Sequence, residues 1–405
     1  MYDAIIIGAR CAGSPTAMLL ARKGYRVLLV DRATFPSDTI STQIIWPMGV
    51  AQLQTWGLLD RLVASNCPKV TKFTMDLGDF PLSGWGPPVQ GIADSYGPRR
   101  FALDKILVDA AVDAGAEFRE GFTVDEILVA DGRVTGVRGR DQGGSPVTED
   151  AKIVIGADGK HSLLARAVQA PEYNAVPSLS CFYYTYWSGV PVDGYEDYWP
   201  GRKFIMTIPT NDDITLIVMA WPCDQFHTIR ANIEKNYMDT IDLVPGLAER
   251  VREGHREEPF YGTADLPNFF RKPYGQGWSL VGDAGYNKDP ITAFGISDAF
   301  RDAQLLSEAI DDGMSGRAGL EEALGEYERR RNESAMPLYE TTLRAAEYDQ
   351  HHPSSMELRA ALQGNQPDTD LFMGVLTGSV PKEEFFNSQN IRRILSQAKD
   401  GGSAV

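Results

Sequence analysis

A glycine-rich turn near the start of the chain lies between two apolar segments. The run Ala4–Ile7 precedes the turn 8–13 (GARCAG), and a helix-like segment then leads to a second apolar run that ends at Asp31. Gly8 allows a tight turn after a strand, and Gly13 allows the next helix to pack close to that strand. The free N–H groups at the helix start could hold a pyrophosphate, and Asp31 could accept hydrogen bonds from a ribose. The spacing therefore predicts a dinucleotide-binding site.

One position departs from the usual pattern of such turns, because Arg10 stands where a second glycine is expected. An arginine there could reach the phosphates or the ring edge of the cofactor with its own forked donors. The alternative is a tight turn without a ligand, which the intact order of strand, turn, helix and strand disfavours. The candidate contacts in this part of the chain are Gly8, Arg10, Cys11, Ala12, Gly13, Asp31 and Arg32.

Two further turns combine glycine and aspartate at the end of an apolar run. Residues 152–155 (KIVI) lead into the turn 156–159 (GADG), and residues 278–281 (WSLV) lead into Gly282-Asp283. Three such turns, in this order and at these intervals, resemble the flavoprotein hydroxylase superfamily typified by para-hydroxybenzoate hydroxylase. The resemblance covers residues 1–60, 98–170 and 268–345.

The middle turn fits the D-G-x-x-S-x-x-R pattern of these relatives at Asp158, Gly159, Ser162 and Arg166. The resemblance implies that this turn touches FAD and takes part in the use of NAD(P)H, since the family has no separate second nucleotide-binding domain. The alternative is an ordinary strand-to-helix turn with Ser162 near the start of the helix.

For the third turn, the resemblance implies that Asp283 binds a ribityl hydroxyl of FAD. Pro290 and Gly295 then carry the backbone past the isoalloxazine ring to a helix that opens at Ile296. Reduced flavin is anionic on its pyrimidine side, so free N–H groups at residues 296–298 would stabilise that charge.

The resemblance adds contacts from two other segments. Arg100 begins a predicted helix where relatives place an arginine against FAD, although it could instead pair with a nearby carboxylate. The loop 38–43 lies where relatives bring side chains to the flavin, although its polar groups could simply cap the loop. The cofactor contacts implied in this way are Thr42, Gln43, Arg100, Asp158, Gly282, Asp283, Pro290, Gly295 and Ile296.

The order of the predicted elements divides the chain into three units and predicts the α/β class. A discontinuous Rossmann-like FAD-binding domain has a parallel sheet, because its apolar strands alternate with helices. A substrate domain has an antiparallel sheet, because its runs alternate aromatic and β-branched residues with polar ones. A helical C-terminal region follows. These units span 1–66, 98–172 and 268–345; 67–97 and 173–267; and 346–405.

The predicted antiparallel sheet offers aromatic and sulfur-containing side chains, which suit a flat apolar substrate beside the flavin. Only alternate residues of a strand face one side, so about half of the candidates must point elsewhere. The pattern singles out no general base, and the catalytic residues stay unassigned. The candidate substrate contacts are Tyr184, Tyr186, Met206 and Met219.

Composition limits the partners and the location of the chain. Its 43% hydrophobic and 23% charged residues are typical of a globular protein, and its net charge of -16 disfavours nucleic acid and anionic membranes as partners. No apolar run reaches the roughly 18 residues that span a bilayer, and the acidic start lacks the basic segment of a signal peptide. We therefore expect a cytoplasmic protein, either a monomer or a homodimer. The four scattered cysteines predict neither disulfides nor a metal site.

The resemblance implies an FAD-dependent monooxygenase that uses NAD(P)H and O2. It would hydroxylate or epoxidise a small apolar substrate, aromatic or polycyclic, through a flavin hydroperoxide. One alternative is a reductase of the geranylgeranyl reductase type, although residues 41–43 (STQ) stand where its cysteine-glycine loop would be. A flavin halogenase is another, although its W-x-W-x-I-P pattern is absent. A non-enzymatic FAD-binding or sensor protein is the third, which the middle turn disfavours.

Overall fold

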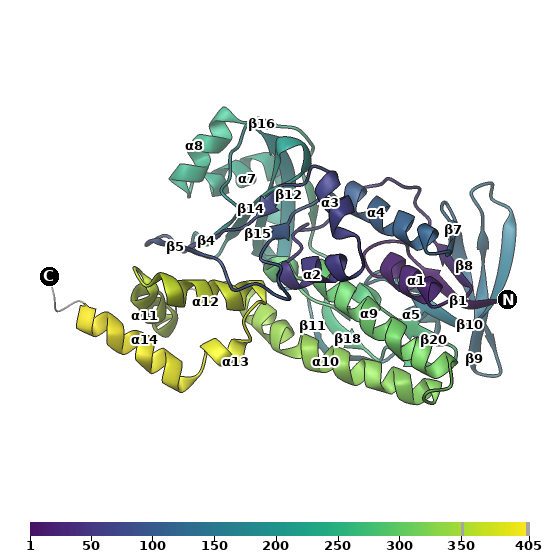
Figure 1. Ribbon diagram of the computed structural model, residues 1–405. Coiled ribbons are helices and arrows are strands. Elements are labelled where there is room, and N and C mark those ends of the chain that lie inside the picture. Colours follow the sequence, from purple (N-terminus) through teal and green to yellow (C-terminus); the bar gives the residue numbers. More distant parts are fainter. Residues whose placement is uncertain (350–351, 402–405) are drawn as a thin grey trace.

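The computed structural model describes residues 1–349 and 352–401, with side chains up to residue 398 in the last helix. Figure 1 shows one sheet near the N-terminus, a second sheet in the upper middle and a group of helices near the C-terminus. A mostly parallel sheet, an antiparallel sheet and C-terminal helices confirm the predicted α/β architecture. Residues 350–351 and 402–405 of the predicted helical region lie outside the described residues.

The central strands of the first sheet, β1 (Tyr2–Ile7), β2 (Val27–Val30) and β20 (Trp278–Leu280), are buried on both faces, as is usual for parallel sheets. Its order is β19-β20-β10-β1-β2-β7; β1, β2, β7, β10 and β20 run parallel, and β19 is antiparallel to β20. The register pairs Ile7 with Gly156 and Gly156 with Leu280, so the turns that follow β1, β10 and β20 lie at one edge. The sheet and its attached hairpin comprise β1 (Tyr2–Ile7), β2 (Val27–Val30), β7 (Glu117–Arg119), β8 (Thr123–Ala130), β9 (Arg133–Arg140), β10 (Pro146–Gly156), β19 (Tyr274–Gly275) and β20 (Trp278–Leu280).

Helices bury one face of this sheet. Leu20, Leu107 and Leu306, from three different helices, belong to the same buried cluster as Ile6 and Leu29 of the strands. The first of these helices has a proline in its opening turn, where the missing N–H costs no hydrogen bond. The helices of this unit are α1 (Gly13–Arg22), α2 (Pro47–Thr55), α3 (Leu59–Ala64), α4 (Arg100–Asp113), α5 (Leu163–Ala167), α9 (Gly295–Met314) and α10 (Leu320–Ala345).

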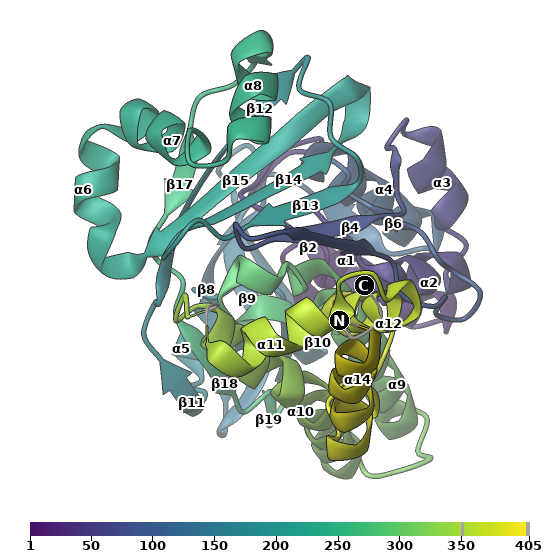
Figure 2. The same ribbon diagram turned by 90° about the vertical axis from the view of Figure 1, so that its left-hand side faces the viewer.

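The antiparallel sheet has two buried faces that belong to different clusters. Along the strand Ser180–Ser188, Phe182, Tyr184 and Tyr186 belong to one cluster, while Tyr183 and Trp187 belong to the other. The second cluster packs under α6 (Phe226–Ala231), α7 (Ile233–Ile241) and α8 (Pro245–Glu253), which lie to the left of and above the sheet in Figure 2. The strands are β4 (Phe73–Asp76), β5 (Pro81–Gly84), β12 (Ser180–Ser188), β13 (Tyr195–Tyr198), β14 (Phe204–Pro209), β15 (Ile214–Pro222), β16 (His255–Arg256) and β17 (Tyr261–Thr263).

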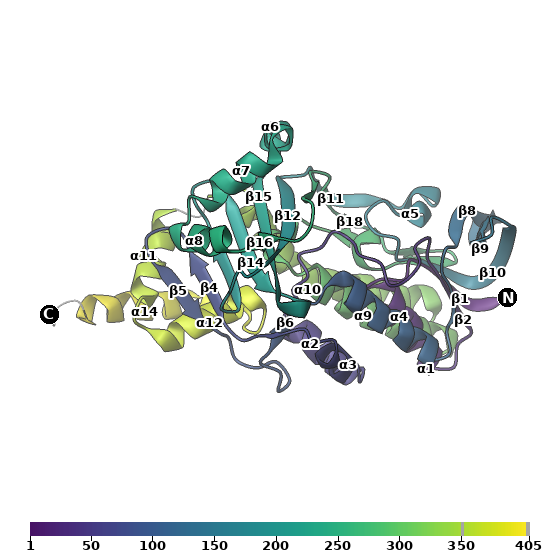
Figure 3. The ribbon, with the colours of Figure 1, turned by 90° about the horizontal axis from the view of Figure 1, so that it is seen from above.

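Short elements and the C-terminal helices complete the fold. Figure 3 shows the C-terminal helices beside β4 and β5, away from the N-terminus, and α12 contacts β5. No helix among residues 1–349 and 352–401 is long and apolar enough to cross a membrane. The remaining elements are β3 (Lys69–Val70), β6 (Ser95–Tyr96), β11 (Glu172–Val176), β18 (Asn268–Arg271), β21 (Tyr286–Asn287), η1 (Asn211–Asp213), η2 (Cys223–Gln225), η3 (Gly282–Ala284), η4 (Pro290–Thr292), α11 (Pro353–Leu362), α12 (Gln366–Thr377), α13 (Lys382–Phe385) and α14 (Ser388–Gly401).

Replacement of Gly13 by alanine should destabilise the protein severely. A Cβ atom at this position would lie 1.8 Å from the carbonyl oxygen of Gly8, which belongs to backbone at the end of β1. We expect Gly13→Ala to lower the free energy of unfolding by ~3 kcal/mol or more in denaturant titrations. Gly246→Ala in α8 is the matched control, since nothing lies within 4 Å of its Cβ position. Equal stability of both variants would contradict the close packing of the first turn.

Candidate functional site

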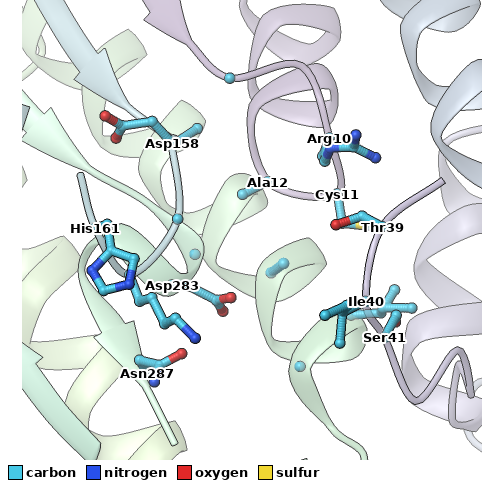
Figure 4. Close-up of a pocket in the computed structure, with 18 of the residues that line it drawn as sticks. Arg10, Cys11, Ala12, Thr39, Ile40, Ser41, Asp158, His161, Asp283 and Asn287 are labelled. Atoms are coloured by element: carbon cyan, nitrogen blue, oxygen red, sulfur yellow. The ribbon is translucent and has the colours of Figure 1, made fainter. Parts of the chain in front are cut away.

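A cavity of about 770 Å³ lies between the edge of the parallel sheet and the antiparallel sheet. The three glycine turns, the loop Thr39–Thr42, the segment from Tyr286 to Ile296 and strands β12 and β15 all contribute to its lining. A volume of this size is typical of small-molecule and cofactor sites. Figure 4 shows residues of two sides of this cavity: Arg10, Thr39, Ile40 and Ser41 on one, and Asp158, His161, Asp283 and Asn287 on the other.

The first turn brings backbone to the cavity wall. Gly8 has a φ of 105°, and a Cβ atom there would lie 2.4 Å from the carbonyl oxygen of Ala157. Cys11 and Ala12 line the cavity at the start of α1, where unpaired N–H groups favour an anion. Gly13, a predicted cofactor contact, lies outside the lining and serves the packing of the helix against the turn.

A single buried carboxylate holds two of the predicted contacts. Arg10 Nη1 donates to Asp104 Oδ2 at 2.5 Å, and Arg100 Nη2 donates to Asp104 Oδ1 at 3.0 Å. Arg10 also donates to the hydroxyl of Ser37 at 3.1 Å. Both arginines line the cavity. Arg100 therefore pairs with a carboxylate and still lies at the site. A ligand would share the guanidinium of Arg10 with these partners.

Asp31 is oriented by backbone donors at the cavity. Its Oδ2 accepts from the N–H of Ala9 at 2.7 Å, and its Oδ1 accepts from the N–H of Ala33 at 2.8 Å. Both Asp31 and the exposed Arg32 line the cavity. A carboxylate fixed in this way keeps free lone pairs for a ribose hydroxyl.

The residues of the middle turn mainly stabilise that turn. Asp158 Oδ2 accepts from the N–H of Leu163 at 2.6 Å, and Ser162 caps α5 through the N–H of Ala165. The guanidinium of Arg166 donates to the carbonyl of His161. Burial raises the pKa of Asp158. These contacts are the ones expected of an ordinary strand-to-helix turn. Asp158 also lines the cavity.

Asp283 presents its carboxylate to the cavity (Figure 4). Within the described part of the chain, this carboxylate has no hydrogen-bond partner. Surrounding protein raises the pKa of Asp283, while the charges of Lys288 and Arg100 act to lower it. Gly282 also lines the cavity, and a Cβ there would lie 2.7 Å from the Cβ of Ala12, so the first and third turns touch. A carboxylate open to the cavity can accept hydrogen bonds from a ligand hydroxyl.

The segment after the third turn leads along the cavity to α9. Pro290, Gly295 and Ile296 line the cavity, and no atom lies within 4 Å of the Cβ position of Gly295. The expectation of free N–H groups at residues 296–298 needs one correction, because the N–H of Asp298 donates to the carbonyl of Phe294 at 2.9 Å. The first turn of a helix has orphan N–H groups, but its fourth residue already closes an intrahelical bond.

The loop between β2 and α2 contributes only part of what the sequence predicts. Thr42 lines the cavity, as do its three preceding residues. Gln43 does not line the cavity. It is fully buried, and its side-chain amide donates to the hydroxyl of Tyr186. Its backbone φ is 61°. Gln43 therefore joins the loop to the antiparallel sheet and lies outside the cavity lining.

Of the four predicted substrate contacts, only Tyr184 lines the cavity. Tyr186 and Met206 share its buried cluster but lie outside the lining. Met219 is a correction, since it belongs to the cluster on the opposite face of the sheet, under the helices. Met219 pairs with Tyr183, whereas Tyr184 pairs with Val218. Because neighbouring residues of a strand face opposite sides, Met219 and Tyr184 lie on different faces of the sheet.

Several apolar lining residues were missed by sequence reasoning. Phe182 lies two residues before Tyr184 on the same face of β12, and Val218 is the partner of Tyr184 on β15. Period-two spacing from Tyr184 would have indicated Phe182. Phe294 and Leu266 also line the cavity and belong to the same cluster, but they come from loops without a periodic signal.

Asp289 is a fully buried acid in the cavity lining that the sequence did not single out. Its Oδ1 accepts from the N–H of Ile291 at 3.1 Å, and its N–H donates to Asn268 Oδ1 at 2.7 Å. Burial raises the pKa of Asp289 to about 6. The adjacent Lys288 forms a buried ion pair with Asp298. Among the described residues, no cluster of His, Cys, Asp and Glu could hold a metal ion.

A model of the FAD binding domain family matches residues 1–342. Protein FixC of Salmonella typhimurium is 31% identical over 374 residues, which cover 83% of this chain and 82% of that protein. The 1H-pyrrole-2-carbonyl-(peptidyl-carrier protein) brominase of Pseudoalteromonas luteoviolacea is 23% identical over 332 residues, 78% of each chain. Digeranylgeranylglycerophospholipid reductase of Methanothrix thermoacetophila is 24% identical over 344 residues, 82% of this chain and 83% of that enzyme.

Solved structures with the same fold extend over the whole chain. A flavoprotein/dehydrogenase from Cytophaga hutchinsonii superposes with a TM-score of 0.81 at 19% identity and covers 99% of both chains. The myxobacterial chondrochloren halogenase CndH gives 0.78 at 21% identity, covering 99% of this chain and 97% of its own. PqsL of Pseudomonas aeruginosa, described as a probable FAD-dependent monooxygenase, gives 0.70 at 17% identity, covering 98% and 99%.

The residues at the cavity fit FAD. The unpartnered carboxylate of Asp283 can accept a hydrogen bond from a ribityl hydroxyl, and the N–H groups at the start of α1 can bind a pyrophosphate. Asp31 is held for a ribose by two backbone donors. The open space at Gly295 leaves room for a flat ring against the backbone.

Removal of the Asp283 carboxylate should weaken FAD binding. We expect Asp283→Ala to raise the dissociation constant of FAD about 10- to 100-fold, because a hydrogen bond to a charged group contributes roughly 1.5–3 kcal/mol. Titration of the apoprotein by flavin fluorescence measures this change. Asp239→Ala in α7 is the control, since that exposed carboxylate pairs with Lys235 and lies outside the lining. Unchanged affinity of Asp283→Ala would show that the third turn is misassigned.

Proposed function

Because the chain belongs to the FAD binding domain family and is an FAD-dependent oxidoreductase, we propose that it is an NAD(P)H-dependent monooxygenase. Its substrate is a small apolar molecule, aromatic or polycyclic, that is hydroxylated or epoxidised. The hydroxylation balances as RH + O2 + NAD(P)H + H⁺ giving ROH + NAD(P)⁺ + H2O. One oxygen atom enters the product and the other leaves as water.

The observation that carries the proposal is the apolar wall opposite the proposed flavin position. Phe182 and Tyr184 of β12 and Val218 of β15, all three buried, line the cavity from one face of this strand pair. Phe294 and Leu266 extend this surface. An apolar wall binds a flat apolar substrate and excludes water, which protects a reactive oxygen species from wasteful breakdown.

The residues of the three turns have distinct tasks when FAD is bound. Cys11 and Ala12 offer backbone N–H groups to the pyrophosphate, Asp31 accepts from the ribose, and Asp283 accepts from a ribityl hydroxyl. Gly295 and Ile296 line the cavity at the start of α9, and the free N–H groups there would stabilise negative charge on the flavin. FAD itself supplies the hydride acceptance and O2 activation that no side chain can supply.

The relatives include a reductase and a brominase, so both activities are competing outcomes. The W-x-W-x-I-P pattern expected of a halogenase is absent from the sequence, and residues 41–43 (STQ) replace the cysteine-glycine loop expected of the reductase. Both observations support oxygen transfer over halogenation and alkene reduction.

Isotope labelling tests the proposed reaction. The FAD-loaded protein is reduced anaerobically with NADPH or NADH and then mixed with ¹⁸O2 and a panel of phenols, indoles and polycyclic aromatics. We expect substrate to accelerate NAD(P)H oxidation and the product to contain one ¹⁸O atom. A halogenated product that requires bromide or chloride would show a halogenase. A saturated product formed without O2 would show a reductase, and either result would overturn the proposal.

Two adjacent tyrosines provide a matched test of the apolar wall. The hydroxyl of Tyr184 has no hydrogen-bond partner among the described residues and faces the cavity, while Tyr183 lies on the opposite face of β12. We expect Tyr184→Phe to raise KM for a phenolic substrate about 2- to 10-fold, because the hydroxyl of Tyr184 can hydrogen-bond the phenol and a neutral hydrogen bond contributes roughly 0.5–1.5 kcal/mol. Tyr183→Phe should leave KM unchanged. Equal KM values for the two variants would show that the hydroxyl of Tyr184 does not contact the substrate.

A further inference from the structure

One stacked pair of side chains holds both ends of a loop that lines the cavity. Arg99, the residue before α4, lies with its Cζ 3.8 Å from the centre of the Tyr186 ring of β12. Arg99 Nη2 donates to Asp38 Oδ2 at 3.0 Å, and the hydroxyl of Tyr186 accepts from the side-chain amide of Gln43. Asp38 and Gln43 stand on either side of the loop 39–42. We call Asp38, Gln43, Arg99 and Tyr186 the Arg99 clasp.

The loop 39–42 forms part of the boundary between the cavity and solvent. All four of its residues line the cavity, and Ile40 is 51% exposed. Within residues 1–349 and 352–401, no backbone N–H or C=O group of the loop bonds to a helix or a strand, and its side chains donate no hydrogen bond to other elements. Hydrogen bonds therefore hold the loop only at its ends.

The Arg99 clasp uses the particular geometry of an arginine. The side chain of Arg99 is only 13% exposed and lies between two carboxylates, Asp38 and Glu258, and Glu258 Oε1 accepts from Arg99 Nη2 at 2.7 Å. Glu258 is itself fixed to β12, because its backbone carbonyl accepts from the hydroxyl of Thr185 at 2.7 Å. A flat guanidinium can stack on a ring and pair with carboxylates at once, whereas a lysine ammonium cannot reproduce both contacts. Arg99 therefore ties the loop to the antiparallel sheet.

The Arg99 clasp also touches the apolar wall. The rings of Tyr186 and Tyr184 meet edge to face with 5.7 Å between their centres, and both belong to the same buried cluster on one face of β12. Tyr184 lines the cavity, as the loop 39–42 does. The clasp therefore fixes the separation of the loop and the wall, which are two sides of one compartment.

The chain beyond the loop is anchored separately. Arg10 of the first turn donates to the hydroxyl of Ser37 at 3.1 Å, and the N–H of Ile45 donates to the carbonyl of Tyr96 at 2.8 Å. Release of the Arg99 clasp therefore frees only the short segment between these two anchors, and the glycine turns and both sheets keep their positions.

We propose that the loop 39–42 is the gate of the substrate compartment and that Arg99 is the positioning residue that closes it. An open gate admits the substrate, and a closed gate keeps water from the oxygen-transfer step. If the compartment stays open, the uncoupled reaction NAD(P)H + H⁺ + O2 giving NAD(P)⁺ + H2O2 replaces oxygen transfer. The gate itself requires only the cavity, whereas its task of protecting oxygen transfer rests on the proposed function.

Limited proteolysis measures the gate without any reaction. Thermolysin cleaves before exposed apolar residues, so a cut between Thr39 and Ile40 reports opening of the loop. Cleavage of a briefly opened segment follows the population of its open form. We expect Arg99→Gln to speed this cut about 10-fold in the FAD-loaded protein, because a hydrogen bond between charged groups is lost. Mass spectrometry of the fragments gives the rate at this bond and at every other cleavage site.

Two further variants complete the test. Asp38→Asn changes a side chain that is 36% exposed, and it should speed the same cut by a smaller factor, which decides the question if Arg99→Gln does not fold. Arg256→Gln is the matched control. Arg256 Cζ lies 4.5 Å from the centre of the Phe260 ring and Arg256 pairs with Glu234 at 3.1 Å, but this arginine lies outside the cavity lining. Its replacement should leave cleavage before Ile40 unchanged.

The share of NAD(P)H oxidation that yields hydrogen peroxide tests the task of the gate. With a substrate that the wild type oxygenates, we expect Arg99→Gln to raise this share several-fold, because water reaches the open compartment. Arg99→Lys should raise it less, since its charge can still pair with a carboxylate. Arg256→Gln should match the wild type.

The outcomes separate the gate from the proposed function. If Arg99→Gln and Asp38→Asn are cut before Ile40 at the wild-type rate, or if cleavage rises equally at all sites, the Arg99 clasp does not close the loop and the inference is wrong. If the cut is faster but the peroxide share is unchanged, the gate does not protect oxygen transfer. If the wild type forms no oxygenated product, the proposed function fails, while the cleavage rates still decide whether the clasp closes the cavity.

Discussion

The site depends on backbone touching backbone at the edge of the parallel sheet. Gly8 lies against Ala157, Gly13 lies against the carbonyl of Gly8, and Gly282 lies against Ala12, with Cβ positions that would fall 1.8–2.7 Å from those atoms. Only glycine fits such contacts, because any side chain would need the space of a neighbouring turn. These contacts bring the turns of β1, β10 and β20 together, and the cavity exists because those turns converge.

Buried charge supports the same arrangement. Asp104 of α4 binds Arg10 of the first turn and Arg100 of its own helix, so one carboxylate joins the first turn to a helix 94 residues away in the chain. Lys288 and Asp298 form a second buried pair between the third turn and α9. Breaking a buried pair by removing one partner leaves an uncompensated charge, which is costly, so these pairs hold the cavity walls in one geometry.

The two faces of β12 divide the antiparallel sheet between different tasks. One face packs under α7 and α8, and the other contributes Phe182 and Tyr184 to the cavity. Sequence reasoning identified this sheet and the kind of side chain it offers. It could not assign faces, because both faces of β12 are buried and their residues have the same apolar character. Met219 and Tyr184 became distinguishable only through strand register, which pairs Tyr184 with Val218.

The sequence by itself determined the α/β class and the three turns, because glycine and aspartate at strand ends leave a local pattern. Fourteen of the sixteen predicted cofactor contacts border the cavity, since a local motif specifies local backbone; Gly13 and Gln43 do not. Only the tertiary structure decided which partners those residues have: Arg10 binds Asp104, and Gln43 donates to Tyr186. These partners are distant in the chain, and no short-range pattern encodes which buried side chains meet.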